Sequence, residues 1–163
     1  PVYSPKAGDK IKIGDLELEI LYPLEKLGDE IVWKSAEQPR VLGLVNYTGN
    51  LNQTVIVAEL IYGQFKALLT SDMGIEQEKQ IESELEKVDI LKIAHHGSKY
   101  SSSQEFLEVV SPQLAVISVG AKNNYHHPSS KSLRRLEQLA IKILRTDLQG
   151  EVEIVSDGRG WYT

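Results

Sequence analysis

The chain has 163 residues, of which 41% are hydrophobic and 25% are charged, which is enough for one domain, residues 1–163, with a hydrophobic core. Its net charge of -5 argues against a surface that grips nucleic acid by bulk electrostatics, and the absence of cysteine excludes disulfides and thiolate metal ligands. The apolar runs are only strand-sized and the first residues lack the pattern of a signal peptide, so we expect a soluble chain without a membrane span.

The first part of the chain is predicted to form two β-hairpins separated by a long loop. Apolar and charged residues alternate on both sides of Gly14-Asp15, and two β-branched runs flank Tyr62-Gly63. Asp72 comes directly after the second hairpin. The predicted segments are strands 10–13 and 16–22, a loop over 23–47 that contains Trp33, and strands 53–61 and 64–70.

The middle of the chain begins with a predicted amphipathic helix over 75–87, whose charged residues we expect to face solvent. A buried strand follows and ends in His95-His96-Gly97-Ser98. Ser102 and Glu105 have the spacing of a capping box, which predicts a short helix that Pro112 stops. We interpret Ser98 and the serines at 101–103 as turn and cap residues rather than nucleophiles.

The last part of the chain alternates strands with helical and turn patterns. Its basic residues Lys122, Lys131, Arg134 and Arg135 are expected to lie on a solvated surface, and Trp161 to be a core or edge aromatic. The predicted segments are a strand over 114–119, a polar loop over 120–127, a helix from Ser129 or Ser130 to about Ala140, a strand over 141–145, and a hairpin over 151–156 and 159–162 around Asp157-Gly158.

All four histidines fall in two adjacent pairs, His95-His96 and His126-His127, and each pair follows a predicted strand, as Asp72 does. If these strands are neighbours, their ends converge at one edge of the sheet. An aspartate grouped with imidazoles suits Zn²⁺ or Mn²⁺ better than Ca²⁺. The alternative interpretation is that the imidazoles are structural, buried or capping groups.

Several motifs resemble the metallo-β-lactamase-like domain of ComEC-type competence proteins. Residues 68–72, LLTSD, resemble the family's LLTGD, and residues 91–98 with the serines at 101–103 resemble LKVAHHGSxxSS. Residues 116–120 and 123–128 resemble ISVG and NxYGHP, and the segment from Arg145 to Gly158 resembles RTDxxG and ISDG. The resemblance extends over nearly the whole chain.

This resemblance implies an α/β (α+β) fold, an αββα sandwich, in hydrolases that use one or two metal ions to cleave an ester, amide or phosphodiester. In competence proteins the domain is attached to a membrane channel for DNA uptake and is thought to act as a nuclease on incoming DNA. The family therefore implies association with the bacterial membrane and nucleic acid as a substrate.

Carried over position by position, Asp72 is expected to be a bridging metal ligand and His127 the late histidine ligand. His95 and His96 are expected to supply the motif's histidine pair, one as ligand or acid and the other as its orienting partner. We favour His96 as the ligand, while the sequence leaves open which of the two faces the site. Ser98, Asn123 and His126 lie beside these residues in the motifs and complete the predicted site.

Two departures replace a family glycine, with Ser71 in LLTGD and His126 before the HP dipeptide. Both are expected to be mild; for Ser71 this holds unless the backbone needs a positive φ, and His126 adds an imidazole near the site. The third departure is larger, because the family's first metal motif, of the HxHxDH kind, is absent. The chain is thus expected to be the C-terminal half of the αββα domain, as an excised fragment or a truncated gene product.

Since zinc needs three or four protein ligands, Asp72, His127 and one more histidine are expected to hold at most one ion weakly, or none. We therefore expect little hydrolase activity from this chain alone. The competing hypothesis is a metal-free, non-catalytic module that binds a partner chain or nucleic acid. Half of a sandwich also leaves an apolar sheet face uncovered, which predicts a homo-oligomer, a covering partner or a partial rearrangement.

Overall fold

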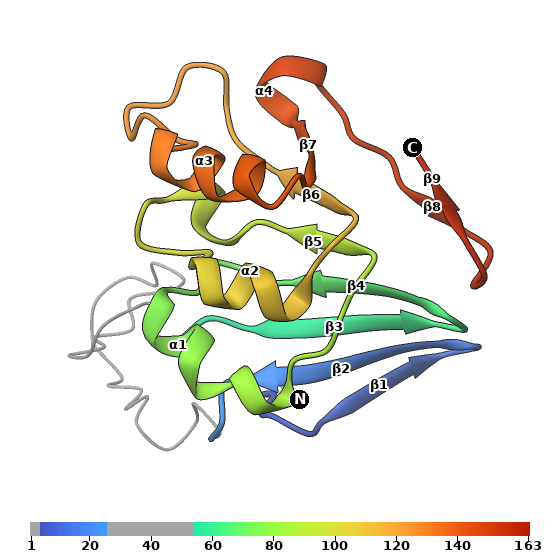
Figure 1. The fold of residues 1–163 in the computed structure, drawn as a ribbon. Coiled ribbons are helices and arrows are strands. Elements are labelled where there is room, and N and C mark those ends of the chain that lie inside the picture. The colour runs from blue at the N-terminus through green and yellow to red at the C-terminus, as the bar shows by residue number, and fades with distance from the viewer. Residues whose placement is uncertain (1–3, 26–53) are drawn as a thin grey trace, which may run out of the picture.

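Seven strands form one mixed sheet in which the order in space follows the order in sequence (Figure 1). The structure is a computed structural model that describes residues 4–25 and 54–163. The strands are β1 (Lys10–Ile13), β2 (Leu16–Tyr22), β3 (Val57–Tyr62), β4 (Phe65–Leu69), β5 (Ile90–Lys92), β6 (Leu114–Ile117) and β7 (Lys142–Arg145). The predicted loop over 23–47 and Trp33 lie largely or wholly outside the described residues.

The sheet changes character at β4. Strands β1 to β4 are antiparallel neighbours, and the pairs β1–β2 and β3–β4 form the two predicted hairpins. Strands β4 to β7 are parallel and are connected through helical segments. Parallel neighbours need crossover connections, which are usually helices. Strands that such helices cover have nearly continuous apolar sequences. The predicted mixed α/β class is therefore confirmed.

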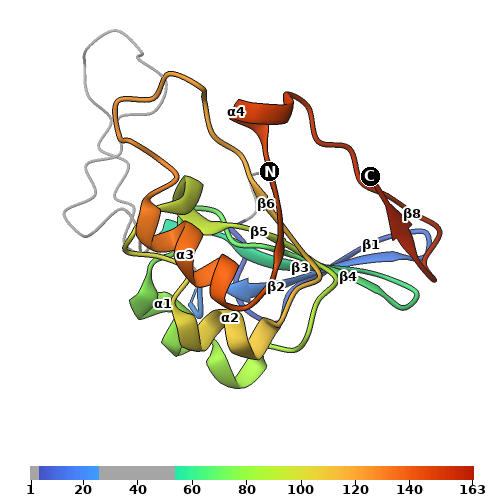
Figure 2. The same ribbon diagram turned by 45° about the horizontal axis from the view of Figure 1, so that its top comes forward.

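Helices α1, α2 and α3 lie on one face of the sheet (Figures 1 and 2). They pack on the larger of two apolar clusters, in which Leu68, Leu91 and Leu107 are at most 1% exposed. Ser129, one of the two serines at which this helix was predicted to begin, caps α3, and Leu133, Leu136 and Leu139 pack on this cluster. The helical segments are α1 (Ile75–Gln80), η2 (Glu82–Glu84), η3 (Ala94–Gly97), α2 (Gln104–Val110), α3 (Ser130–Gln138) and α4 (Thr146–Gln149).

The opposite face of the sheet carries a smaller apolar cluster at Phe65, Ala67, Ile90 and Leu114. Trp161 and Ile154 pack on it from the C-terminal segment, which ends in the hairpin of β8 (Val155–Ser156) and β9 (Trp161–Tyr162) (Figure 2). Trp161 is thus a packing residue, as predicted.

Farther along this face the apolar side chains of β1 are open to solvent. Ile11 is 46% and Ile13 is 71% exposed, and Ile11 is in register with Leu18 of β2, which pairs with Leu60 of β3. The C-terminal segment therefore covers the middle of the face and leaves the β1 end open. Oligomerisation through this end remains a prediction.

The predicted helix over 75–87 is too long, and one of its charged residues is buried, while the others face solvent as predicted. Helix α1 ends at Gln80, and Glu78 is only 2% exposed. Its carboxylate accepts hydrogen bonds from the backbone N–H groups of Ser102, at 2.5 Å, and Ser103, at 3.0 Å. Burial raises the pKa of the Glu78 carboxyl, against the lowering effect of these hydrogen bonds and of Arg135.

Arg135 is also not a freely solvated residue. Its Nη1 donates to the carbonyl oxygens of Ser101, at 2.8 Å, and Ser102, at 2.9 Å. Together with Glu78, Arg135 holds the serine segment from both sides, which fixes the start of α2. The N-cap of that helix is Ser103, whose Oγ accepts from the Phe106 N–H, and not Ser102.

The C-terminal hairpin differs from its prediction in turn and length. Ser156 pairs with Trp161, so four residues rather than two connect β8 and β9. Asp157 Oδ1 accepts from the N–H groups of Arg159 and Gly160, and this local bonding satisfies the longer turn. Helix α4 is a single turn that the sequence analysis did not predict.

Candidate functional site

The carboxyl ends of β4, β5 and β6 meet at one edge of the sheet, because these strands are parallel neighbours. Asp72 follows β4, His95 and His96 follow β5, and the loop from Ser118 to His127 follows β6. Thr70 Oγ1 donates to the Lys92 carbonyl at 2.5 Å, and His95 N donates to the Ser71 carbonyl at 3.0 Å, which ties the ends of β4 and β5 together. The predicted convergence of these strand ends is confirmed.

His96 is the residue that links the three strand ends. Its Nδ1 lies 2.6 Å from the carbonyl oxygen of Ser118, and its Nε2 lies 3.8 Å from Oδ1 of Asp72. Since a carbonyl oxygen only accepts, Nδ1 carries a proton, and Nε2 is the ring nitrogen that faces Asp72. The second ring nitrogen of His96 therefore lies beside a carboxylate, and both side chains are about half exposed.

His95 and His127 form a second contact at the same edge. Their rings meet edge to face with centroids 5.9 Å apart. Burial is the main cause that lowers the pKa of His127, and the nearby His95 and His96 lower it further, against the opposing charge of Asp72. His127 is consequently neutral near pH 7, and its Nδ1 is buried without a hydrogen-bond partner.

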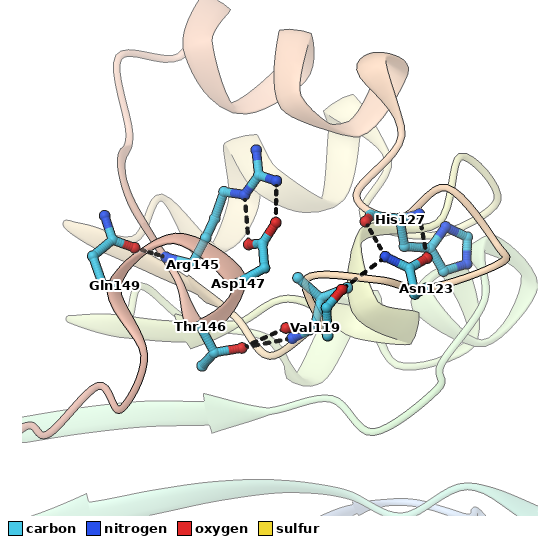
Figure 3. Close-up of polar contacts among 8 residues, drawn as sticks. Val119, Asn123, His127, Arg145, Thr146, Asp147 and Gln149 are labelled. Atoms are coloured by element: carbon cyan, nitrogen blue, oxygen red, sulfur yellow. Dashed lines mark hydrogen bonds and ion pairs between the residues drawn. The ribbon is translucent and has the colours of Figure 1, made fainter.

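Asn123 fixes the loop that carries His127. Its Oδ1 accepts from the His127 N–H at 2.9 Å, and its Nδ2 donates to the carbonyl oxygens of His127, at 2.8 Å, and Gly120, at 3.0 Å (Figure 3). Asn123 therefore acts on the backbone of the loop. His126 is exposed and does not line the pocket described below, although it is the sequence neighbour of His127.

The serines after the histidine pair have local roles, as interpreted from the sequence. Ser98 is 3% exposed, and its Oγ accepts from the Tyr100 N–H at 3.3 Å. Ser101 Oγ donates to the Ala94 carbonyl at 3.0 Å. Gly97, directly before Ser98, has φ +83°, and a Cβ there would lie 2.6 Å from Cβ of Pro128, so only glycine fits where the two loops pack.

The two departures from the family's glycines both fall at positive φ. Ser71 has φ 47° and His126 has φ 56°, the left-handed conformation in which glycine is favoured. For Ser71 the stated exception therefore applies, because the backbone there has a positive φ. For His126 the expectation of a mild change is wrong for the backbone, which is strained at this position. His95 and His96 share this conformation, with φ 49° and 54°.

Thr146 lies in the RTDxxG-like motif, but the sequence predicted no role for it. Its Oγ1 accepts from the Val119 N–H at 2.8 Å and donates to the Val119 carbonyl at 2.9 Å (Figure 3). Arg145 beside it makes two hydrogen bonds to Asp147, which lower the pKa of that carboxyl. Helix α4 thereby anchors the end of β6. Thr146 is also one wall of a pocket of about 350 Å³ that includes His96, Asn123, Tyr125 and His127.

The donor set fits a metal ion only in part. Two ligands of a tetrahedral zinc, each about 2.1 Å from the ion, lie about 3.4 Å apart, close to the separation of His96 Nε2 and Asp72 Oδ1. A ligating histidine commonly donates its other N–H to a backbone carbonyl, as His96 does to Ser118. Within residues 4–25 and 54–163, however, no group of three or more histidine, aspartate or glutamate side chains is arranged to hold a metal ion.

Comparison with known proteins gives several similar sequences, while no protein-family model matches the chain. The chain is 33% identical over 150 residues to ComE operon protein 3 of Bacillus subtilis, covering 91% of this chain and 17% of that protein. It is 36% identical over 107 residues to Competence protein ComA of Neisseria gonorrhoeae, covering 64% of this chain and 15% of that protein. It is 32% identical over 111 residues to Recombination protein 2 of Haemophilus influenzae, covering 68% of this chain and 14% of that protein.

The chain thus spans about a sixth of the length of these relatives. No helix in the described part of the chain has the length and apolarity that crossing a membrane requires.

Proposed function

Because the chain is homologous to a segment of competence proteins of the ComEC type, we propose that it serves DNA uptake as half of a hydrolase site with a metallo-β-lactamase-like fold. The substrate class is the phosphodiester of DNA, and the cofactor is Zn²⁺ or Mn²⁺. The observation that carries the proposal is the line from the Ser118 carbonyl through His96 to Asp72. The remaining ligands are supplied by another segment of the protein.

In this proposal Asp72 and His96 hold the metal, and His127 stands next to them as a neutral imidazole. The ion supplies Lewis-acid activation of the phosphodiester. The Ser118 carbonyl fixes the His96 ring with Nε2 toward Asp72, so the chain's own contribution is a preformed pair of ligands. His95, whose ring contacts His127, is the candidate proton donor to the leaving oxygen.

A second candidate function is the metal-free binding module. It is supported by the absence of a three-residue ligand group in the described part of the chain. In this case the Asp72–His96 contact is a polar pair that orders the strand ends, and the chain acts by binding a partner or nucleic acid.

Titration calorimetry with Zn²⁺ and Mn²⁺ separates the two candidates. Under the hydrolase proposal the chain binds one ion weakly, and the Asp72→Asn and His96→Asn variants lose at least tenfold of that affinity. Asparagine is chosen at position 96 because it tolerates the positive φ of His96.

The matched control is His126→Asn. It also removes an imidazole at a positive φ, in the neighbouring loop, and leaves Asp72 and His96 untouched. We expect it to bind the metal as the unmodified chain does. Absence of binding by the unmodified chain, or equal loss in the control, would remove the support for the hydrolase proposal and favour the binding module.

A further inference from the structure

An exposed aromatic ring stands at the pocket beside the Asp72–His96 pair. Tyr125 is 81% exposed, and one face of its ring lies on His127, with centroids 5.9 Å apart and the planes 21° from parallel. Because so much of the side chain is exposed, the rest of the ring is open to solvent. A tyrosine ring held open in this way is available for stacking.

The loop that presents Tyr125 is held at both of its ends. Asn123 bonds to the backbone of Gly120, near the start of the loop, and of His127, its last residue. Thr146 bonds both backbone groups of Val119, the second residue of the loop (Figure 3). A planar ligand that stacks on Tyr125 therefore has little loop ordering to offset, which favours binding.

Three of the residues that line the pocket use their polar groups within the protein. Asn123 and Thr146 use their side-chain groups on the backbone, and the Ser118 carbonyl accepts from His96. These groups are therefore not available to read the edge of a ligand by hydrogen bonding. The volume of about 350 Å³ is at the small end of ligand pockets, about 300–1,000 Å³, so it suits one small planar group.

We propose that Tyr125 and this pocket hold one nucleobase of a single-stranded nucleic acid by stacking, without preference among bases. The inference rests on the proposed function. Stacking on Tyr125 would hold the nucleic-acid strand next to the Asp72–His96 pair, which would act on its phosphodiester. Stacking on an aromatic ring is a common way to bind single strands, and it tolerates any base because every base has a π-face. It also suits a chain whose net charge of -5 gives it no general attraction for phosphates.

The test is equilibrium binding of a short single-stranded oligodeoxynucleotide that carries 2-aminopurine, measured by fluorescence quenching in the presence of EDTA. Tyr125→Leu keeps an apolar side chain but removes the ring, and we expect about tenfold weaker binding with loss of quenching. Tyr125→Phe should bind within about twofold of the unmodified chain. Oligonucleotides of the four bases should bind with similar affinity.

Two further variants control the assay. Tyr100→Leu removes another tyrosine that is 68% exposed but lies outside the pocket, and it should bind as the unmodified chain does. Gly120→Leu adds a side chain at a residue that lines the pocket, where a Cβ meets no atom within 4 Å, so it adds bulk there without a clash and should weaken binding.

Equal binding by Tyr125→Leu and the unmodified chain would overturn the inference, as would equal binding of an oligonucleotide with abasic sites. Displacement of the oligonucleotide from the unmodified chain by an apolar peptide, with no quenching, would mean that the pocket takes a protein side chain. Asp72→Asn should keep full oligonucleotide binding in EDTA. A failure of metal binding and a failure of base stacking are therefore seen in separate experiments.

Discussion

The core under the helices and the loops at the strand ends are built in opposite ways. The core is regular: Leu68, Leu91 and Leu107 lie in strands or helices and are at most 1% exposed. The loops hold non-glycine residues at positive φ, among them His95 and His96, and bond their side chains to backbone. The difference indicates that the core supplies the stability while the loops hold an unfavourable local geometry, which is typical of functional sites.

The largest effect is expected from truncation in the core. Leu91 is fully buried in β5, whereas Leu69, at the end of the adjacent β4, is 39% exposed. Leu91→Ala should lower the free energy of unfolding by about 2–5 kcal/mol, and Leu69→Ala, as the matched control, by much less. Urea unfolding monitored by circular dichroism measures both. Equal losses would mean that a side chain at the end of a strand contributes as much to stability as one in the core, which would contradict the difference between the core and the strand ends.

The next effect is expected where core and loops meet, at Glu78. Glu78→Ala leaves the buried N–H groups of Ser102 and Ser103 without an acceptor, which should cost about 1–3 kcal/mol of unfolding free energy. Glu76→Ala is the matched control, because Glu76 is an exposed glutamate in the same helical turn. It should change the unfolding free energy by less than about 0.5 kcal/mol.

The same variant has an expected pH dependence. Burial raises the pKa of the folded-state Glu78 carboxyl above its ordinary value of 4.5, so the folded chain binds this proton more tightly than the unfolded chain. The contribution of Glu78 to stability is therefore fully present below pH 4.5 and is reduced as pH rises through the folded-state pKa. The difference between the unmodified chain and Glu78→Ala should shrink from about pH 4 to pH 7. A difference that grows over this range would contradict the sign.

The same contrast decides how much of the fold could be predicted from sequence. The apolar pattern of the strands predicts all seven strands of the large sheet, and the serine cap with the helical apolar pattern predicts α3. These patterns lie within the elements themselves. The length of α1 could not be predicted, because Glu78 is buried by a loop more than twenty residues later in the chain. The pattern 75–87 is amphipathic in sequence, and only the tertiary partners decide which of its charges are buried.

The site shows the same limit. The residue types and the position of Asp72, His96 and His127 after strands predict where the site lies, because parallel strands bring their ends to one edge. Which histidine points toward Asp72 depends on two successive left-handed residues and on the Ser118 carbonyl, which no local pattern encodes. Thr146 was missed for a related reason, since its role is to bond the backbone of a neighbouring strand end.

The smallest effect, and the one that tests the loops directly, is relief of their strain. Ser71→Gly and His126→Gly should each raise the free energy of unfolding by about 0.5–1 kcal/mol, because glycine adopts φ 47° and 56° without a Cβ clash. Ala121→Gly in the same loop as His126 is the matched control. Its φ is not positive, so the added freedom of the unfolded chain should lower stability by a similar amount. Stabilisation by Ala121→Gly as well would mean that glycine acts there through general loop flexibility. Changes of opposite sign in the two variants and in the control would show that the loops hold a backbone geometry that their own residues disfavour. The regular core holds no such geometry.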